Sequence, residues 1–535
     1  MSLSTCEPQQ RDGKDSDSNH SFITVIPIDF PRNRGFPQPP DQYSDYSPGD
    51  GDYVSDGSKL DQGVDEVGGI TREINSKYKQ VISHDYEDTP HNPQWDRTNN
   101  SQADSPGQSL NVCVYLMGDI ALCMELEDGT NTTVEDLVKA IVAEEQLGLP
   151  PSAFKMFTLW MCSGLLELQL KPHHRALAIR AKWPDLLARY AHATESRQRR
   201  DEPVLSFQRN IFIPQSCDEQ IKDTRVLDLL YAEARYNILE GRYPCEVAHF
   251  IVLGGIQARL ELGPYNPQIH TINFFRDQSS RFLPIHMRRG AWTSWLHLSG
   301  KNSPEVRLLE HYKRIPASTP DRKLQKKYLE IVWALPYYGC VFFQGQVEQP
   351  VRGLLSLIIH QDVPVLVGIN LKGVYIIDNV QCTLLLGLKY EELCWDFAKP
   401  SHEENPDCLP CLFLQFRVLE NGTRVSKVLQ IFSKQAVMMD ALIARFVEET
   451  KKKTSLAQRT DEVDKPLTYD TGTDSDGNGV QIPLATLTQR DMSQSCLGNK
   501  LSKLTLATFD EEVTNNPFPQ DETTIPLTTF LPSTS

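Results

Sequence analysis

The sequence predicts an α+β protein with three folded lobes in the centre and a disordered tail at each end. Residues 1–110 and 451–535 are rich in Asp, Ser, Thr, Pro and Gln, a composition that buries too little apolar surface to offset chain entropy. Between the tails the hydrophobic period changes twice. Strand-like runs with a helix fill residues 111–200, helical spacing fills 201–336, and strand-like runs return over 337–450.

The first lobe begins with the strand-like runs NVCVYLM and IALCMELE, which are separated by a predicted hairpin turn at Gly118-Asp119. A helix follows, because apolar residues recur at three- and four-residue spacings from Val134 to Ile141. Further strand-like runs and a final DLLARY complete the lobe. Two strands, a helix and more strands in this order are typical of a ubiquitin-like fold.

The second lobe is predicted to be helical over residues 205–335. Its first long helix has Thr224 as N-cap, Gly241 just after the C-cap, and one apolar stripe. Pro244 suits the first turn of the next helix, which is apolar almost all round and is therefore expected at the centre of a bundle. Another helix begins at Thr319-Pro320. The stripe consists of Leu227, Leu230, Tyr231, Ala234 and Ile238.

The third lobe returns to the period of strands. Seven strand-like runs, separated by Gly, Pro, Asn and Asp, lie between residue 339 and residue 432. Ser433 then caps one long helix that is predicted to end near Thr450. Seven strands closed by a C-terminal helix are typical of a pleckstrin-homology or phosphotyrosine-binding sandwich.

The charge of the chain is unevenly distributed. Residues 111–450 carry 39 acidic and 37 basic side chains, whereas residues 1–110 carry 19 and 9 and residues 451–535 carry 12 and 8. Phosphate binding needs a positive excess on the binding domain. A nearly neutral central block therefore disfavours a nucleic-acid partner.

The apolar segments do not predict secretion or membrane insertion. The first residues, MSLSTCEPQQRDGKDSD, lack the apolar run of a secretory signal. The longest apolar run, from Ile331 to Phe343, has thirteen residues and contains Pro and Gly, whereas a spanning helix needs about 20. We therefore expect an intracellular protein whose twelve cysteines are reduced.

Several gapped motifs in the central block resemble the FERM domain family. LSFQRNIFIP resembles the Phe-Arg-x-x-Phe-x-Pro pattern that opens the family's helical lobe, with one residue inserted between Phe207 and Arg209. The resemblance also covers YLEIVWALPYYGCVFF and VGINLKGVYI in the third lobe. Other matching positions are Phe212, Pro214, Leu230, Tyr231, Ile238, Leu239, Gly241, Arg242, Pro244, Cys245, Gln257, Gly263 and Tyr265. The resemblance implies the family's ubiquitin-like, helical and phosphotyrosine-binding-like lobes.

The fragments LLELQLKP, YPCEV, LGPYNP and ELCWD are similar to one branch of this family. That resemblance implies a non-enzymatic adaptor, cytoplasmic and peripheral at the plasma membrane. It also implies partners: the cytoplasmic tails of iRhom pseudoproteases, which carry an ADAM-type sheddase, and the tails of Wnt co-receptors. Two alternatives remain, an ezrin-like link between membrane and cytoskeleton and an enzyme that a FERM block targets. No cofactor and no metal are expected.

A phosphotyrosine-binding-like lobe suggests a peptide-binding groove between its fifth strand and its C-terminal helix. The exposed strand edge can accept an extended peptide through backbone hydrogen bonds, while side-chain pockets give selectivity. The matching positions are Leu393, Cys394, Trp395, Asp396 and Phe397 on the strand and Met439, Leu442, Ile443 and Phe446 on the helix. The alternative is that the helical stripe is core, or that partners dock at lobe interfaces.

Two weaker candidate sites lie outside this groove. Family members bind phosphoinositides, and basic residues gather at Lys171, Arg175, Arg180 and Lys182, although a solvated face explains them equally well. In the C-terminal tail, Asn516, Pro517 and Phe518 form the tripeptide that EH domains recognise, a pattern that also recurs by chance.

Cys245 and His249 stand four residues apart, as two metal ligands or a thiol and its base would on a helix. We interpret Cys245 as a buried joint between two helices, since free cysteine is among the most buried residue types. We likewise interpret His249 as a core histidine. The chain lacks the GxSxG, GxxxxGK[ST] and HExxH motifs, so no catalytic residue is proposed.

Overall fold

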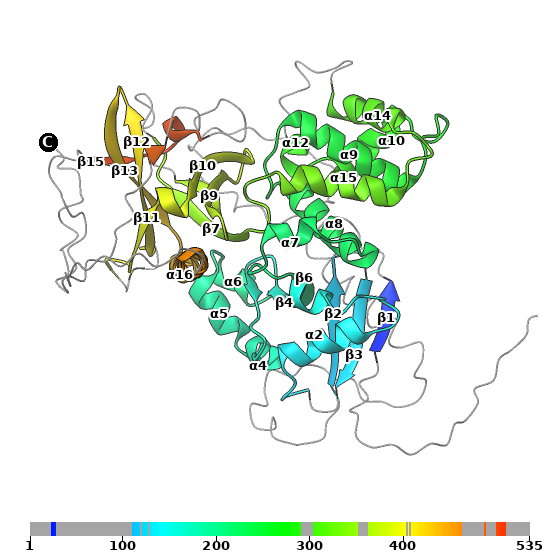
Figure 1. Cartoon of the computed structure of the whole chain (residues 1–535), viewed down its shortest axis with the longest axis horizontal. Helices are drawn as coiled ribbons and strands as arrows, with labels where there is room; N and C mark the ends of the chain where they lie inside the picture. The colour runs from blue at the N-terminus through cyan, green and yellow to red at the C-terminus, as the bar shows by residue number, and fades with distance from the viewer. Residues whose placement is uncertain are drawn as a thin grey trace, which may run out of the picture. The chain divides into compact units, whose positions relative to one another are not determined.

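The structure is a computed structural model. It describes residues 23–27, 110–117, 120–126, 129–289, 303–350, 362–402, 405, 408–462, 486–487 and 499–509. These residues form a six-stranded sheet, a helical lobe and a nine-stranded sheet, and they all lie in one compact unit of the chain (Figure 1). The mixed helix and sheet architecture confirms the predicted fold class.

The first lobe is a six-stranded sheet covered by helices, with strand order β1-β3-β2-β6-β4-β5. The predicted hairpin is present, because β2 and β3 pair antiparallel from Leu110↔Leu126 to Leu116↔Ile120. α2 begins at a capping box in which Thr133 and Asp136 bond reciprocally, and its apolar face is buried. The elements are β1 Ile23–Pro27, β2 Leu110–Leu116, β3 Ile120–Leu126, α2 Val134–Ala143, α3 Ala153–Met156, β4 Phe157–Cys162, β5 Glu167–Gln169, α4 Ala176–Ala181, α5 Trp183–Tyr190, α6 Glu195–Gln198 and β6 Val204–Arg209.

The boundary between the first two lobes differs from the prediction. Residues 204–209 were expected to be part of the helical lobe, but they form β6, which pairs parallel with β2 and antiparallel with β4. The strand Val204–Arg209 therefore belongs to the first sheet. Its sequence, VLSFQR, has three apolar residues, Val204, Leu205 and Phe207, and a short run of this kind is ambiguous by periodicity.

The second lobe is helical, and the predicted apolar stripe on α8 is fully buried. Two helix starts differ from the prediction. Asp223 rather than Thr224 caps α8, because its carboxylate accepts from the amides of Arg225 and Val226. α9 starts after Glu246, so Pro244 precedes the helix instead of standing in its first turn. The elements are α7 Gln215–Glu219, α8 Thr224–Leu239, α9 Val247–Leu262, α10 Ile272–Asp277, α11 Ser279–Phe282, α12 Ile285–Arg289, α14 Pro304–Arg314 and α15 Asp321–Trp333.

The third lobe contains all seven predicted strands, followed by the predicted helix α16. The strand order is β10-β9-β8-β7-β13-β12-β11. β7 meets β13 only at Gln346↔Phe432, so the two halves of the sheet diverge from this point. The elements are β7 Val341–Val347, β8 Val363–Asn370, β9 Gly373–Asp378, β10 Thr383–Lys389, β11 Cys394–Ala398, β12 Cys411–Glu420, β13 Thr423–Phe432 and α16 Ala436–Glu462.

Several segments of the predicted tails have secondary structure, and here the prediction of disorder is corrected. β1 adds to the first sheet beside β3, and α16 continues to Glu462 instead of ending near Thr450. Two further strands, β14 (Thr486–Leu487) and β15 (Ala507–Phe509), add to the third lobe. Residues 499–506, which precede β15, are also described and contain the 3-10 turn Leu501–Lys503, whereas the remaining tail residues lie outside the described ones. Short apolar runs inside polar tails were thus sufficient to extend existing sheets.

Two large apolar cores hold the lobes together. One core is continuous between the first and second lobes, where Phe157, Phe207 and Tyr328 are buried. The second core fills the third lobe and includes the buried side chains Phe416 and Phe446. The first core also includes Tyr375 and Ile377 of β9, and the second includes Trp160 of β4, so apolar packing crosses the boundary between the third lobe and the other two.

A buried polar cluster links the three lobes. Nε of Arg209, at the end of β6, donates to the carboxylate of Asp218 at 2.6 Å, and the hydroxyl of Tyr338 donates to the same carboxylate at 2.9 Å. Gly339 follows with φ +71°, and a Cβ there would lie 2.9 Å from Nη1 of Arg209. Glycine is required at this position, because any side chain would meet the guanidinium in a strained backbone conformation.

The junction also decides the roles of Cys245 and His249. Cys245 is buried, and neighbouring Arg242 pairs with Glu167 of β5 through a hydrogen bond of 3.0 Å. The interpretation of Cys245 as a joint agrees with this burial. His249, in contrast, is exposed, so its interpretation as a core histidine is wrong. Within the described part of the chain, no group of three or more His, Cys, Asp or Glu is placed to hold a metal.

Candidate functional site

The candidate site is the edge of the third lobe formed by β11. β11 stands at one end of the strand order and pairs antiparallel with β12 from Cys394↔Gln415 to Ala398↔Cys411. On its other side no strand pairs with it among the described residues. An edge strand offers unpaired backbone amides and carbonyls, which is the property that strand addition requires.

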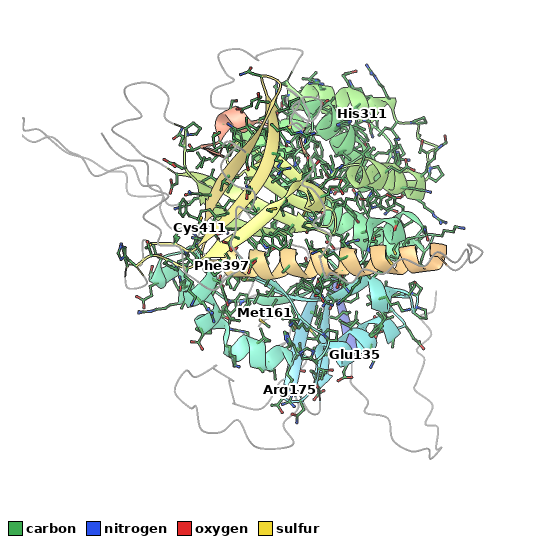
Figure 2. The ribbon with its side chains drawn as sticks, turned by 60° about the vertical axis from the view of Figure 1, so that its left-hand side comes forward. Glu135, Met161, Arg175, His311, Phe397 and Cys411 are labelled. Carbon is green, nitrogen blue, oxygen red and sulfur yellow. The ribbon has the colours of Figure 1, made fainter. Side chains whose placement is uncertain are left out.

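Helix α16 lies against this edge strand (Figures 1 and 2). The indole Nε1 of Trp395 donates to the carboxylate of Asp440 at 2.9 Å and so joins the strand to the helix. Trp395, Phe397 and Leu442 are half-buried and pack against the edge of the core. Figure 2 shows Phe397 next to the helix. The strand and the helix thus present three partly accessible apolar side chains beside a polar link.

Four of the nine predicted groove residues do not line an open surface. Leu393 is 4% exposed, and Met439, Ile443 and Phe446 are 0% exposed. All four belong to the core of the third lobe, where Phe446 contacts the ring of Phe212 with centroids 5.5 Å apart. The prediction is therefore corrected for these residues, because the helical stripe faces the sheet. Cys394, Trp395, Asp396, Phe397 and Leu442 remain as the candidate surface.

The edge strand is protected by its own acidic side chain. The backbone amide of Phe397 donates to the carboxylate of Asp396 at 2.8 Å, and Asp396 is exposed. Charged side chains on an edge strand discourage unselective pairing with other strands. A partner strand would have to displace this carboxylate from the amide. Selectivity would then depend on which side chains of the partner strand contact Trp395 and Phe397.

The thiol of Cys394 on the same strand has no features of a nucleophile. Burial raises the pKa of Cys394, and the charge of Arg417 only partly opposes this effect. Because the thiolate is the reactive form of cysteine, a raised pKa disfavours covalent chemistry. The arrangement around β11 is therefore suited to binding.

A second edge of the same lobe was missed by the sequence analysis. Residues 499–509, which we name the C-terminal strap, lie against β10 and β13, and their final part is β15. Figure 1 shows β15, at the red end of the colour range, beside β13. The strap could have been predicted from the three leucines of LSKLTL, which recur at short intervals within a polar tail.

The predicted phosphoinositide residues lie around α4: Lys171 and Arg175 precede the helix, Arg180 is in its last turn and Lys182 follows it. Lys171, Arg175 and Lys182 are exposed, and Figure 2 shows Arg175 on the first lobe. Arg180 is paired with the carboxylate of Glu202, which compensates its charge. The EH-domain tripeptide, Asn516 to Phe518, lies outside the described residues. Among the described helices, none combines the length and the apolar character that crossing a bilayer requires.

Two family models match the chain. The model described as "KRIT1/FRMD8, FERM domain C-lobe" matches residues 363–442, and the model described as "FERM central domain" matches residues 216–343. The first range begins at β8 and includes β11 together with the first part of α16. The second covers nearly the whole helical lobe and extends into β7.

The chain is also similar to curated proteins named FERM domain-containing protein 8. It is 39% identical to the Xenopus laevis protein over 359 residues, which are 65% of this chain and 77% of the relative. It is 36% identical to the Homo sapiens protein over 367 residues, which are 66% of this chain and 77% of the relative. A Dictyostelium discoideum protein named FERM domain-containing protein B is 21% identical over 300 residues, 54% of this chain and 58% of that relative.

Solved structures with more distant sequences resemble the chain. The human Myosin 7b C-terminal MyTH4-FERM domain in complex with the harmonin-a PDZ3 domain has a TM-score of 0.43 at 15% identity and covers 64% of this chain and 60% of its own. The complex of the FERM and C-terminal domains of Drosophila Merlin has a TM-score of 0.39 at 15% identity and covers 65% of this chain and 99% of its own.

Proposed function

Because the chain belongs to the FERM domain-containing protein 8 family, we propose that it is a non-enzymatic adaptor whose third lobe binds the cytoplasmic tail of a membrane protein. The relatives support a FERM scaffold as the general function. The finer part of the proposal is that an extended segment of the tail adds to β11 as a further strand. An otherwise disordered tail would lose conformational entropy on binding and would gain backbone hydrogen bonds and apolar contacts.

The observation that carries this proposal is the edge of β11, with which no further strand pairs in the part of the chain that the structure describes, together with the half-buried side chains along it. Backbone groups of the edge supply affinity for any extended peptide, whereas Trp395, Phe397 and Leu442 supply contacts that depend on the peptide's sequence. Trp is among the residues most often found to dominate binding energy at interfaces. Its hydrogen bond to Asp440 holds the indole in a fixed position before a partner arrives.

The tails that the family resemblance implies are those of iRhom-type pseudoproteases, with Wnt co-receptor tails as further candidates. Binding would hold the adaptor in the cytoplasm at the plasma membrane. It would also cover a surface that sorting or degradation factors otherwise reach, and the partner's sheddase complex would gain stability at the cell surface. A membrane contact through Lys171, Arg175 and Lys182 would add about 1 kcal/mol for each cation near an anionic leaflet.

The two alternatives predict different features. An ezrin-like linker needs a basic, helical actin-binding segment, whereas residues 451–535 carry 12 acidic and 8 basic side chains. An enzyme that a FERM block targets needs a further catalytic domain. Limited proteolysis distinguishes these possibilities, because the adaptor proposal expects one resistant core around residues 111–450. A resistant tail fragment that stays folded when separated from this core would favour a targeted enzyme, since the short tail strands β1, β14 and β15 belong to the core's own sheets.

The test of the proposed function is capture of an iRhom-type cytoplasmic tail by the purified full chain. Substitution Trp395→Ala is expected to weaken capture more than about ten-fold, the size seen for a central aromatic contact. Leu419→Ala is the matched control, since Leu419 is an exposed apolar residue near the far end of β12. Unchanged capture by a folded Trp395→Ala protein would show that the β11 edge is the wrong site.

A further inference from the structure

The C-terminal strap, residues 499–509, meets β10 at an irregularity in that strand. The register between β9 and β10 shifts between Leu384 and Leu386, so Leu385 is the extra residue of a β-bulge. The carbonyl of Leu385 accepts from the amide of Lys500 at 2.7 Å. The amide of Gly387 donates to the side-chain oxygen of Asn499 at 2.8 Å. The strap thus satisfies two backbone groups on the outer edge of β10.

The other end of the strap meets β13. β15 pairs antiparallel with β13 at Ala507↔Val428, Thr508↔Lys427 and Phe509↔Ser426. This part of β13 is open to strand addition, because its only register pair with β7 is at Phe432. Nζ of Lys427 also donates to the hydroxyl of Thr508 at 2.9 Å. The strap therefore connects the outer edge of β10 with the part of β13 that is not paired with β7, and we name this region the seam.

Between these two ends, the strap buries apolar side chains in the seam. Leu501 is 8% exposed and Leu504 is 5% exposed, and both belong to the core of the third lobe. The short 3-10 turn Leu501–Lys503 places these two leucines three residues apart on one side. Nζ of Lys503 donates to the side-chain oxygen of Gln381 at 2.7 Å. Asn499 thus accepts a hydrogen bond from β10, while Leu501 and Leu504 pack in the core of the third lobe.

From these contacts we infer that the seam is a second peptide-binding edge of the third lobe, and that the strap is its resident ligand. Its recognition pattern is Asn-x-Leu-x-x-Leu followed by a short strand. An extended segment of another protein with the same pattern would compete for the same edges. The inference concerns a site separate from β11 and does not depend on which tail the β11 edge binds.

The strap has the properties of a tethered ligand. Residues 463–498 separate it from the end of α16, so it reaches the seam from a distance in sequence. Strand addition at edges and two anchoring leucines are the contacts that peptide ligands use. Because the strap belongs to the same chain, its effective concentration at the seam is of about millimolar order, so a free peptide must overcome this advantage. Occupancy by another protein would thus require a tight or multivalent partner.

The experiment compares full-length proteins that differ only in the strap. Fluorescence anisotropy measures binding of a labelled synthetic peptide with the sequence of residues 499–509 to the wild-type chain and to the double variant Leu501→Asp, Leu504→Asp. Carboxylates at these buried positions detach the strap. We expect the peptide to bind the double variant at least ten-fold more tightly than the wild type. A peptide that carries the same two Asp substitutions is the control and is expected not to bind.

A milder variant tests whether a change in peptide binding comes from unfolding of the third lobe. Leu504→Ala keeps the strap uncharged but weakens its anchor, and we expect peptide affinity between those of the wild type and the double variant. Circular dichroism and hydrogen exchange on β12 report whether each variant keeps the third lobe. Equal peptide binding by the wild type and by folded variants would overturn the inference. So would equal binding of the wild-type and doubly substituted peptides.

Discussion

The two edges of the third lobe have opposite relations to the rest of the chain. At the β11 edge, no described strand is paired, and α16 and the Asp396 carboxylate stand beside it. At the seam, the chain's own strap is paired to β13 and anchored to β10. In this lobe, one strand edge is shielded by a charged side chain of the same strand, and the other is covered by a segment distant in sequence. Only the first arrangement leaves a surface ready for a partner.

The largest expected effect concerns the helix behind the open edge. Phe446→Ala should lower the free energy of unfolding of the third lobe by about 3–5 kcal/mol, because a fully buried phenylalanine is replaced by a cavity. Urea denaturation monitored by hydrogen exchange on β12 measures the change. Leu442→Ala, one turn earlier and half-buried, should cost clearly less. Equal losses would contradict the division of α16 into core and surface residues.

The next effect concerns the seam. Asn499→Ala removes the acceptor of the Gly387 amide, and a buried group left without a partner costs about 1–3 kcal/mol. Faster hydrogen exchange at Gly387 and at Thr508 would measure the loosened strap. Val380→Ala, at an exposed position between β9 and β10, should change exchange much less. Unchanged exchange at Gly387 in the Asn499→Ala protein would mean that the strap does not protect β10.

A third effect depends on pH and lies where the first lobe meets the start of α16. Nε2 of His192 accepts from the amide of Lys434 at 2.9 Å, so the imidazole must be neutral there. Burial lowers the pKa of His192 to about 4, with the charge of Lys434 acting in the same direction. The bond therefore stabilises the fold fully above the usual pKa of about 6.5. Its contribution is lost as pH falls from there through 4.

The measurement for His192 is the urea midpoint as a function of pH for the wild type and for His192→Asn. Carboxylates also titrate in this range, so the difference between the two proteins isolates the histidine. We expect the wild-type midpoint to fall more steeply between pH 6.5 and 4 than that of His192→Asn. Parallel curves would show that His192 does not link the lobes.

The smallest effect returns to the open edge. Asp396→Ala frees the amide of Phe397, and one additional hydrogen bond is worth about 0.5–1.5 kcal/mol. Affinity for the captured tail should therefore rise by about two- to ten-fold, as titration calorimetry would measure. Asp396→Asn keeps an acceptor beside the amide and should have a smaller effect. A weaker interaction in both variants would indicate that Asp396 contacts the partner directly.

Much of the fold followed from local pattern. The seven strands of the third lobe, the hairpin of the first and the buried stripe of α8 were all predicted, because alternation and helical spacing report which face is buried. The strand β6 was missed because a six-residue run has no distinctive period. Its place in the sheet depends on pairing with β2 and β4, which lie far away in sequence.

The candidate site was predicted only in part. The position of the edge strand followed from the order of strands. Of the nine predicted groove residues, however, four are buried in the core and five remain accessible. Met439, Ile443 and Phe446 share the apolar character of Leu442, and only the packing of α16 on the sheet assigns them to the core. The bond between Trp395 and Asp440 joins residues 45 positions apart, and spacing along a sequence does not reveal such a contact.

By itself, the sequence determined the lobe order, the element types and the family, because hydrophobic period and gapped motifs depend only on the order of residues along the chain. The tertiary structure alone decided which strand edges are covered. Edge pairing joins segments such as residues 426–428 and 507–509, whose contact depends on where the two halves of a sheet diverge. Hydrogen bonding of this kind has no local signature, since any extended backbone can form it.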